Sequence, residues 1–279
     1  MKPKSTLRHF LALLMLACGT AGAETVSFES YTAGNLASVG ALTNNAFTGQ
    51  DGWSSSSSSG AGNVTTTTTS GEYTGGQALA CDTVNGRTYI GANTGYILSS
   101  SYSFDVQLGA EAGVGHWNDD DNDALFDQAE SELMVGIVQV GGINYFGIRT
   151  AGFGTRKYAN ASGGTITSGA GVTGTVGNWY HFAVTYLANG SNYDLTIDVR
   201  DLTTSTDIDF NSGLAGVQPW VTTVTSAEFG VATADAEGLV IRTTTNGGVG
   251  LLDNINTIPE PSAALLGGLG MLALLRRRR

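Results

Sequence analysis

The stretch from residue 179 to residue 200 alternates apolar and polar side chains over most of its length. One face of its first half carries Tyr180, Phe182, Val184 and Tyr186, and one face of its second half carries Tyr193, Leu195, Ile197 and Val199. Such a period of two is typical of strands that bury one face. The turn dipeptide Asn189-Gly190 separates the halves, and a slip of one residue in pairing would expose an apolar face. The sequence therefore predicts a hairpin of strands 179–187 and 192–200, with His181 on the face opposite Tyr180 and Phe182.

Strand patterns recur along the chain, and long helical periodicity is absent between residues 24 and 257. Residues 102–108 alternate, whereas residues 133–140 are almost continuously apolar, as in a strand covered on both faces. Gly141-Gly142 predicts a hairpin into residues 144–150. Further strands are expected at 25–31, 78–81, 229–232, 239–243 and 250–257. About ten or more short strands predict an all-β sandwich of two sheets in one domain.

A low-complexity run of Ser, Gly and Thr occupies residues 54–70. Such a composition favours a flexible loop. Threonine also favours strands, so residues 65–69 are alternatively an edge strand.

Two parts of this pattern resemble a known family. Residues 178–186 (NWYHFAVTY) followed by 193–197 (YDLTI) resemble a hairpin of laminin-G-like domains, and residues 252–255 (LDNI) are similar to the closing strand of those domains. These domains belong to the concanavalin A-like superfamily. The resemblance implies a concanavalin A-like (laminin-G-like) jelly-roll β-sandwich over residues 24–257. Function does not follow from this fold alone.

Residues 1–23 have the three parts of a secretory signal peptide. A basic start is followed by an apolar run at 10–17 and by a small-x-small cleavage site at 21–23. We therefore predict an N-terminal signal helix that is not part of the fold, and an exported protein. Cleavage after Ala23 would remove Cys18 and leave Cys81 as the single cysteine, so no intramolecular disulfide is expected.

Residues 258–279 combine a proline motif, an apolar run and a basic end. The motif is Pro259, Glu260 and Pro261, and the basic end is Arg276, Arg277, Arg278 and Arg279. The 14 apolar residues 262–275 would span about 21 Å as a helix, against a bilayer core of about 30 Å. The arginines would stay on the cytoplasmic side. This pattern predicts a short C-terminal hydrophobic helix that holds the protein transiently in the inner membrane.

The tail resembles the PEP-CTERM sorting signal of Gram-negative bacteria, with all three parts in the right order. The resemblance implies an exosortase-like sorting protease as partner, which recognises and cuts the tail. It also implies a place at the cell surface or in the extracellular matrix, and an association with exopolysaccharide. The alternative is a plain C-terminal anchor.

Charge excludes nucleic acid as a partner. Seven of the 13 basic residues and one of the 24 acidic residues belong to the two terminal segments, which leaves six basic against 23 acidic residues, a net charge near −17. Such a surface repels nucleic acid and lacks the basic footprint that binds it. It favours cations.

The densest acidic cluster, residues 118–130, has the spacing of a twelve-residue calcium loop. Its ligands would be Asp119, Asp121, Asp123, Leu125 through its carbonyl, Asp127 and Glu130. The cluster resembles the loops of EF-hand, dockerin and thrombospondin-repeat proteins. It departs from them at Ala124, where those loops need glycine for a sharp turn. The prediction is a Ca²⁺ site, and the alternative is a solvated acidic loop.

No catalytic residue is predicted, and the protein is not expected to be an enzyme. Neither G-x-S-x-G nor H-E-x-x-H occurs, and after signal removal the remaining histidines are His116 and His181. The carboxylate arrangement of a glycosidase of this fold is missing as well.

A glycan site needs aromatic platforms with polar groups beside them. The candidates are Trp53, Trp117, next to the acidic loop, and Trp220. Trp179, in the middle of a strong strand pattern, is expected to pack in the interior. The sequence thus favours an exported, non-catalytic surface or matrix protein associated with exopolysaccharide. The alternative is a lectin-like carbohydrate-binding module, assisted by calcium, and a glycanase or polysaccharide lyase is less favoured.

Overall fold

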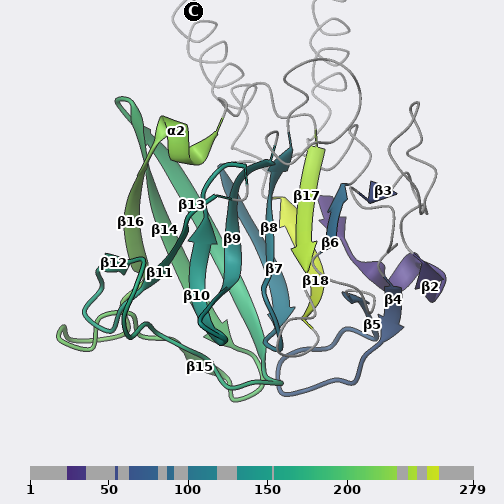
Figure 1. Cartoon of the computed structure of the whole chain (residues 1–279). Helices are drawn as coiled ribbons and strands as arrows, with labels where there is room; N and C mark the ends of the chain where they lie inside the picture. Colours follow the sequence, from purple (N-terminus) through teal and green to yellow (C-terminus); the bar gives the residue numbers. More distant parts are fainter. Residues whose placement is uncertain are drawn as a thin grey trace, which may run out of the picture. The chain divides into compact units, whose positions relative to one another are not determined.

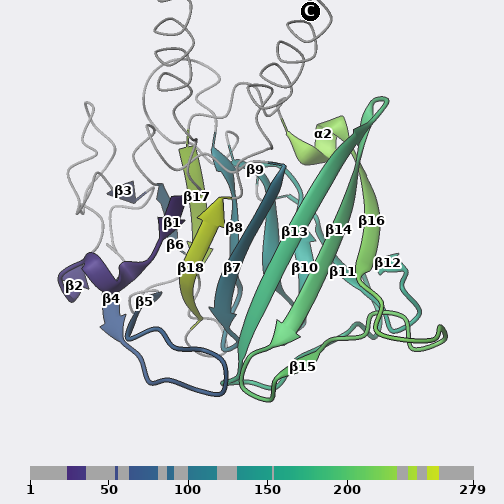
Figure 2. The same cartoon turned by 180° about the vertical axis from the view of Figure 1, so that it is seen from behind.

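The structure is a computed structural model. Among the described residues, almost all of the regular secondary structure consists of antiparallel strands. The structure describes residues 24–35, 54–55, 63–80, 87–90, 100–117, 131–152, 154–230, 238–243 and 250–257. These residues belong to one unit, Glu24–Ile258. Their strands form two sheets that lie face to face, with sheet B nearer the viewer in Figure 1 and sheet A nearer in Figure 2.

Sheet A has 10 strands and sheet B has 8. Sheet A contains β1 (Glu24–Val26), β2 (Gly34–Asn35), β4 (Asn63–Thr66), β5 (Gln77–Ala80), β7 (Ser101–Gln107), β13 (Trp179–Asn189), β14 (Asn192–Asp201), β15 (Thr206–Asp207), β16 (Trp220–Thr225) and β18 (Leu251–Thr257). Sheet B contains β3 (Ser54–Ser55), β6 (Arg87–Ile90), β8 (Ala112–Trp117), β9 (Ser131–Val140), β10 (Ile143–Arg149), β11 (Arg156–Ala159), β12 (Thr165–Ile166) and β17 (Gly238–Thr243).

The chain crosses repeatedly between the sheets. It passes from β5 in sheet A to β6 in sheet B, returns for β7, builds β8 to β12 in sheet B and β13 to β16 in sheet A, and ends with β17 in sheet B and β18 in sheet A. Because neighbours along the chain often lie in opposite sheets, the two layers cannot be separate meanders. The fold is a jelly-roll β-sandwich of two antiparallel sheets, as predicted.

The predicted hairpin of β13 and β14 is confirmed in its register. Phe182 pairs with Val199, and Val184 pairs with Ile197, so the two apolar faces coincide. The turn itself is one residue later than predicted, because Asn189 still pairs with Asn192. Gly190, with φ of 64°, therefore takes the first turn position, where a type II′ turn needs glycine.

Aromatic side chains from both sheets fill the core. Phe104 of β7 stacks on Phe182 with ring centroids 4.9 Å apart, and Phe146 of β10 meets Phe182 edge to face at 5.9 Å. All three rings have no exposed surface. Burying each such side chain contributes about 1.5–3 kcal/mol, so this contact joins the two sheets through their best-buried residues.

Two predicted strands are wrong in part, and local capping explains both. Strand β1 ends at Val26, and the 3-10 helix η1 (Phe28–Ser30) replaces the rest of the predicted strand 25–31. The hydroxyl of Ser27 accepts from the backbone N–H of Glu29 and caps this turn. Of the strand expected at 229–232, residues 231–232 lie outside the described residues, and Phe229 instead ends the helix α2 (Ser226–Phe229), which starts with a capping box of Thr225 and Glu228.

Part of the low-complexity run forms β4, and the strand alternative for residues 65–69 is confirmed for Thr65 and Thr66. Asn63 and Val64 pair with β2 on one side and β5 on the other, whereas Thr65 and Thr66 pair with β5 alone. The two threonines therefore lie in an edge stretch of sheet A, where the strand propensity of threonine prevails. Residues 67–69 are not in a strand.

Several predicted features lie outside the described residues. They are the signal helix at 1–23, the tail at 258–279 with its sorting motif, Cys81, Trp53 and the acidic loop at 118–130. Within the described ranges, none of the helices has the length and apolar character needed to cross a bilayer.

Candidate functional site

The outward face of sheet A carries polar and charged side chains on β13 and β14. Because side chains alternate along a strand, the residues between the core positions point outward. The register places His181 opposite Arg200 and Ala183 opposite Asp198. The same alternation that builds the core therefore also brings these four residues together on the outer surface.

A groove of about 320 Å³ lies at this face, and we call it the β14 groove. It is lined by His181, Ala183, Asp198, Val199, Arg200, Asp207, Ile208 and Val217. Strand β14 pairs with β16 as far as Ile197 and with β15 from Arg200 onward. The carbonyl of Val199 accepts from the backbone N–H of Ile208 at 2.8 Å, which places Ile208 beside the groove. The volume lies at the lower end of the range of small-ligand sites, about 300–1,000 Å³.

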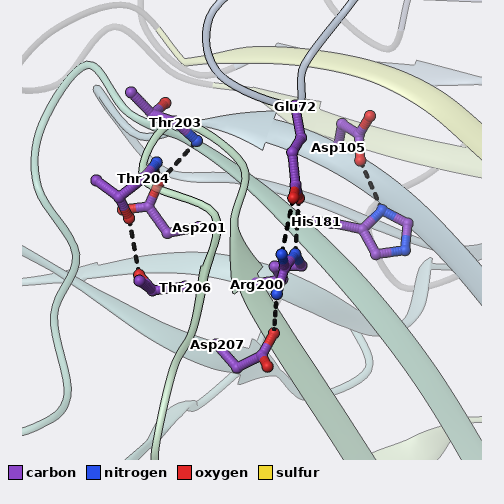
Figure 3. Close-up of polar contacts among 9 residues, drawn as sticks. All are labelled: Glu72, Asp105, His181, Arg200, Asp201, Thr203, Thr204, Thr206 and Asp207. Atoms are coloured by element: carbon purple, nitrogen blue, oxygen red, sulfur yellow. Dashed lines mark hydrogen bonds and ion pairs between the residues drawn. The ribbon is translucent and has the colours of Figure 1, made fainter.

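Arg200 is held rigidly at one wall of the β14 groove (Figure 3). Its Nε and Nη2 donate to the two carboxylate oxygens of Glu72, both at 2.7 Å, and its Nη1 donates to Oδ1 of Asp207 at 2.8 Å. These hydrogen bonds raise the pKa of Arg200 above its ordinary value, and the bond from Arg200 lowers the pKa of Glu72. The guanidinium group is thus a fixed, fully charged donor.

His181 is oriented by a carboxylate. Its Nδ1 lies 2.7 Å from Oδ1 of Asp105, whose other oxygen accepts from Nδ2 of Asn254 at 2.9 Å (Figure 3 shows the pair with Asp105). The His181 side chain is 36% exposed. When Nδ1 donates to Asp105, Nε2 of the neutral ring is the acceptor. His181 therefore offers the groove a hydrogen-bond acceptor of fixed direction.

Asp198 adds a second acceptor beside Ala183. Desolvation, and then the negative charge of Asp207, raise the pKa of Asp198 above its usual value. Ile208 and the largely exposed Val217 give the groove apolar walls. The site therefore combines a cationic donor, several oxygen or nitrogen acceptors and apolar surface, which is the mixture that holds a hydroxylated ligand by its edges and faces.

The segment that carries Glu72 is anchored by an aromatic pair. Tyr73 stacks on Trp179 with ring centroids 3.7 Å apart and planes 6° from parallel. The Tyr73 hydroxyl donates to Oδ2 of Asp253 at 2.8 Å. Trp179 is buried, as predicted, but it lies with Tyr73 and Ala78 in a separate small cluster rather than in the main core. This cluster fixes Glu72 against Arg200.

The end of β14 is fixed by Asp201. Its Oδ1 accepts from the backbone N–H groups of Thr203 and Thr204, at 2.9 and 3.0 Å, and its Oδ2 accepts from Asn178 at 2.8 Å. Figure 3 shows this turn beside the ion pairs of Arg200. The turn leads the chain back into β15, so Asp207 arrives opposite Arg200.

A second polar cluster lies on sheet B. Glu111 forms ion pairs with the Nε atoms of Arg149 at 2.6 Å, Arg242 at 2.9 Å and Arg156 at 3.0 Å. We call these four residues the Glu111 cluster. Burial alone would raise the pKa of Glu111, but the charges of the arginines hold it below its usual value.

Of the predicted glycan platforms, Trp220 is the one whose side chain the structure describes, and it does not line the β14 groove. Trp220 is fully buried, and its Nε1 donates to Oγ1 of Thr165 at 3.1 Å. A buried indole presents no face to a sugar, so the expectation for Trp220 is wrong. Trp53 and the side chain of Trp117 lie outside the described part of the chain.

The structure describes no metal centre in the residues that it covers. Those residues contain no group of three or more His, Cys, Asp and Glu side chains that could hold an ion. All six predicted calcium ligands lie outside the described residues, namely Asp119, Asp121, Asp123, Leu125, Asp127 and Glu130. At the strand ends that flank this segment, Nδ1 of His116 lies 3.4 Å from Oε2 of Glu132.

Sequence reasoning placed His181 on the outward face but missed its partners. Glu72 and Arg200 are 128 residues apart, and His181 and Asp105 are 76 apart. The outward position of Asp105 in a strand of clean alternation is the signal that could have been used. No comparable signal marks Glu72, which lies between strands.

No protein-family model matches this chain, and no curated protein matches it significantly. Solved structures do show similarity. The globular domain of calreticulin from T. cruzi is 11% identical, with a TM-score of 0.43, covering 88% of this chain and 94% of that one. Lectin II from Ulex europaeus is 12% identical, with a TM-score of 0.35 and coverage of 81% and 95%. The winged bean acidic lectin, complexed with methyl-α-D-galactose, is 10% identical, with a TM-score of 0.36 and coverage of 86% and 100%.

Proposed function

We propose that this protein is an exported, non-catalytic surface or matrix protein that binds exopolysaccharide through the β14 groove. The observation that carries the proposal is the fixed arrangement of Arg200 and His181 at one open groove. A guanidinium donor, an imidazole acceptor and the Asp198 carboxylate match the alternating donors and acceptors of sugar hydroxyl groups. Preorganised side chains lose little entropy when a ligand binds.

The same geometry favours binding over catalysis. Asp207 is engaged by Arg200 at 2.8 Å, and Asp105 is engaged by His181 at 2.7 Å. Glycoside hydrolysis needs one carboxyl group that can donate a proton beside a second, ionised one. Arg200 and His181 hold these two carboxylates in place, so Asp198, whose pKa is raised by desolvation and by Asp207, is the carboxyl group of the groove best suited to donate a proton. We propose a lectin-like site because the fixed donors and acceptors suit binding, and the search for new sugar ends described below tests for hydrolysis.

In this proposal, the two ends of the chain determine where the protein is located. The signal-peptide pattern at 1–23 and the tail at 258–279 would send the protein across the inner membrane of a Gram-negative bacterium and on to an exosortase-like protease. The proposed location is the cell surface or extracellular matrix. The source genome provides a check, since a genome that encodes no exosortase would reduce the tail to a plain anchor.

Calcium is the proposed cofactor of the acidic loop. Five carboxylates at positions 119, 121, 123, 127 and 130, with the carbonyl of Leu125, would supply the oxygen ligands that Ca²⁺ requires. Sugar binding at the β14 groove, on sheet A, does not require a bound ion.

Filling the groove tests the proposed function. Neutral oligosaccharides are titrated by calorimetry into the full-length chain, with and without Ca²⁺, and into the variant Ala183→Leu. The larger side chain occupies the groove while the contacts of Arg200 and His181 stay intact. We expect the affinity for neutral oligosaccharides to fall by roughly tenfold or more, because the leucine side chain takes the space that the ligand would occupy.

Thr185→Leu is the matched control, since Thr185 is an exposed residue two positions further along β13 and does not line the groove. It should bind like the parent chain. Unchanged affinity in Ala183→Leu would remove the groove from the proposal. Release of new sugar ends from any oligosaccharide would contradict the non-catalytic assignment.

A further inference from the structure

Three glycines form a row across the outward face of sheet B. Gly136 of β9 pairs with Gly147 of β10 on one side and with Gly113 of β8 on the other. Their positions follow the alternation that turns Arg149 and Arg242 outward while Ile148 and Ile241 enter the core. Glu111, Arg149 and Arg242 line the surface beside Gly113 and Gly136, so the side chains of the Glu111 cluster meet across this row.

The Glu111 cluster brings three guanidinium groups to one carboxylate. Oε1 of Glu111 meets Arg149 and Arg242, and Oε2 meets Arg156 and accepts from the backbone N–H of Gln139 at 3.3 Å. Glu111 is 3% exposed. Taken by themselves, these four side chains have a formal charge of +2, in a chain whose net charge is −11.

The electrostatics of Arg149 agree with an excess of positive charge. Burial lowers its pKa to about 10, and repulsion from Arg242 and Arg156 acts in the same direction, against the attraction of Glu111. A charge that is desolvated and repelled by like charges is stabilised by any anion that approaches it. The cluster is therefore a place where a further negative group would lower the free energy.

Access to the cluster comes from two of the three arginines. The side chain of Arg156 is 39% exposed and that of Arg242 is 19% exposed, whereas that of Arg149 is 8% exposed. Guanidinium groups recognise planar or tetrahedral oxyanions through paired hydrogen bonds. An anionic group can thus approach from Arg156 and Arg242 without displacing the buried pair of Glu111 and Arg149.

We propose that the Glu111 cluster is a second glycan subsite, which binds the carboxylate or sulfate group of an acidic sugar. The subsite lies on the sheet opposite the β14 groove, so it stands whether or not that groove binds neutral sugars. One anionic group fits its two accessible arginines. A densely charged polyanion such as nucleic acid is opposed by the net negative charge of the chain.

The test compares matched oligosaccharides by calorimetry with the full-length chain. An oligouronate, a sulfated oligosaccharide and a neutral oligosaccharide of the same length are titrated at low and at physiological salt. We expect the acidic ligands to bind more tightly than the neutral one, with affinity that falls as salt rises. The carboxylated and sulfated arms tell which oxyanion is preferred.

Variants assign the effect to the cluster. Arg156→Gln and Arg242→Gln should each weaken acidic-sugar binding by roughly tenfold, the loss of one charge-assisted contact. Arg156 is the more exposed of the two, so its variant should fold normally. Lys157→Gln removes the same charge one residue along β11, from a side chain paired with Glu228, and should bind acidic sugars like the parent chain.

Three outcomes would overturn the proposal. The first is equal affinity for acidic and neutral sugars. The second is unchanged binding in both arginine variants, or an equal loss in Lys157→Gln, which would indicate a diffuse charge effect. The third is binding of inorganic sulfate with the affinity of the sulfated oligosaccharide, which would indicate an adventitious ion only. Neutral-sugar binding in Ala183→Leu reports separately on the β14 groove.

Discussion

Asp253 of β18 is a carboxylate with no exposed surface. Its Oδ2 accepts from the Tyr73 hydroxyl at 2.8 Å and its Oδ1 from the backbone N–H of Phe28 at 3.5 Å. Burial raises its pKa from 3.8 to about 6, although these hydrogen bonds act in the opposite direction. The residue that anchors the segment carrying Glu72 is therefore costly to ionise.

This raised pKa predicts a pH-dependent stability. The folded state binds the proton more tightly than the unfolded state, so the contribution of Asp253 is fully present below about pH 4 and is lost as pH rises through about 6. The difference of about two pKa units corresponds to about 3 kcal/mol. Asp253→Asn should flatten the fall in the free energy of unfolding between pH 4 and pH 6, as measured by urea titration at each pH. An unchanged slope in that window would show that other groups cause it.

At the scale of elements, the close approach of β8 to β9 limits which side chains can be accommodated on β9. At Gly136, φ is +153°, and a Cβ there would lie 2.2 Å from the carbonyl oxygen of Ala112 in β8. Gly136→Ala should therefore lower the free energy of unfolding by on the order of 3 kcal/mol, through backbone strain and the clash together. Chemical denaturation of the full-length chain measures the difference.

Gly141→Ala separates these two causes. Gly141 lies in the turn between β9 and β10 with φ of +59°, and a Cβ there meets no atom within 4 Å. The substitution should cost only the left-handed backbone preference, about 1 kcal/mol. If both variants lose the same free energy of unfolding, the approach of β8 to β9 is not tight at Gly136.

Period-two patterns predicted β7 and the hairpin of β13 and β14, and an almost continuous apolar run predicted β9. The pairing of Phe182 with Val199 follows from the rule that two apolar faces must coincide. The short elements were missed where a local cap prevailed over the strand pattern. The box of Thr225 and Glu228, three residues apart, was readable in the sequence as a helix start, whereas the Ser27 cap has no such second residue.

The candidate site was much less predictable than the fold. Alternation gives the side of the sheet for His181, but not its neighbour Asp105, because the partner of each strand depends on the order of strands in the sheet. The bidentate pair of Arg200 and Glu72 joins a strand to a distant connection. Connections have no period, so their side chains cannot be placed by pattern. The prediction of a glycan platform at Trp220 failed because size alone does not distinguish a platform from a core residue. Trp220 is large enough to contact a sugar ring, but it is fully buried.

At the scale of the whole molecule, acidic charge shapes what the protein can bind. Six basic residues remain against 23 acidic ones once the terminal segments are set aside. Self-repulsion in such a chain destabilises the compact state, and bound cations reduce it. The proposed Ca²⁺ site at 118–130 would therefore stabilise the fold beyond its own loop.

Calorimetric titration of the full-length chain with Ca²⁺ checks this proposal. We expect one site with a dissociation constant on the order of 10⁻⁴–10⁻³ M, as in extracellular modules. At a calcium concentration of 100 times that constant, the free energy of unfolding should rise by about 2.7 kcal/mol. The double variant Asp121→Asn with Asp123→Asn removes two carboxylates and should abolish both effects. Asp209→Asn, which keeps the oxygen that accepts from Asn211 and Gln218, should retain them. If no binding heat is measured at millimolar calcium, residues 118–130 are a solvated acidic loop and not a Ca²⁺ site.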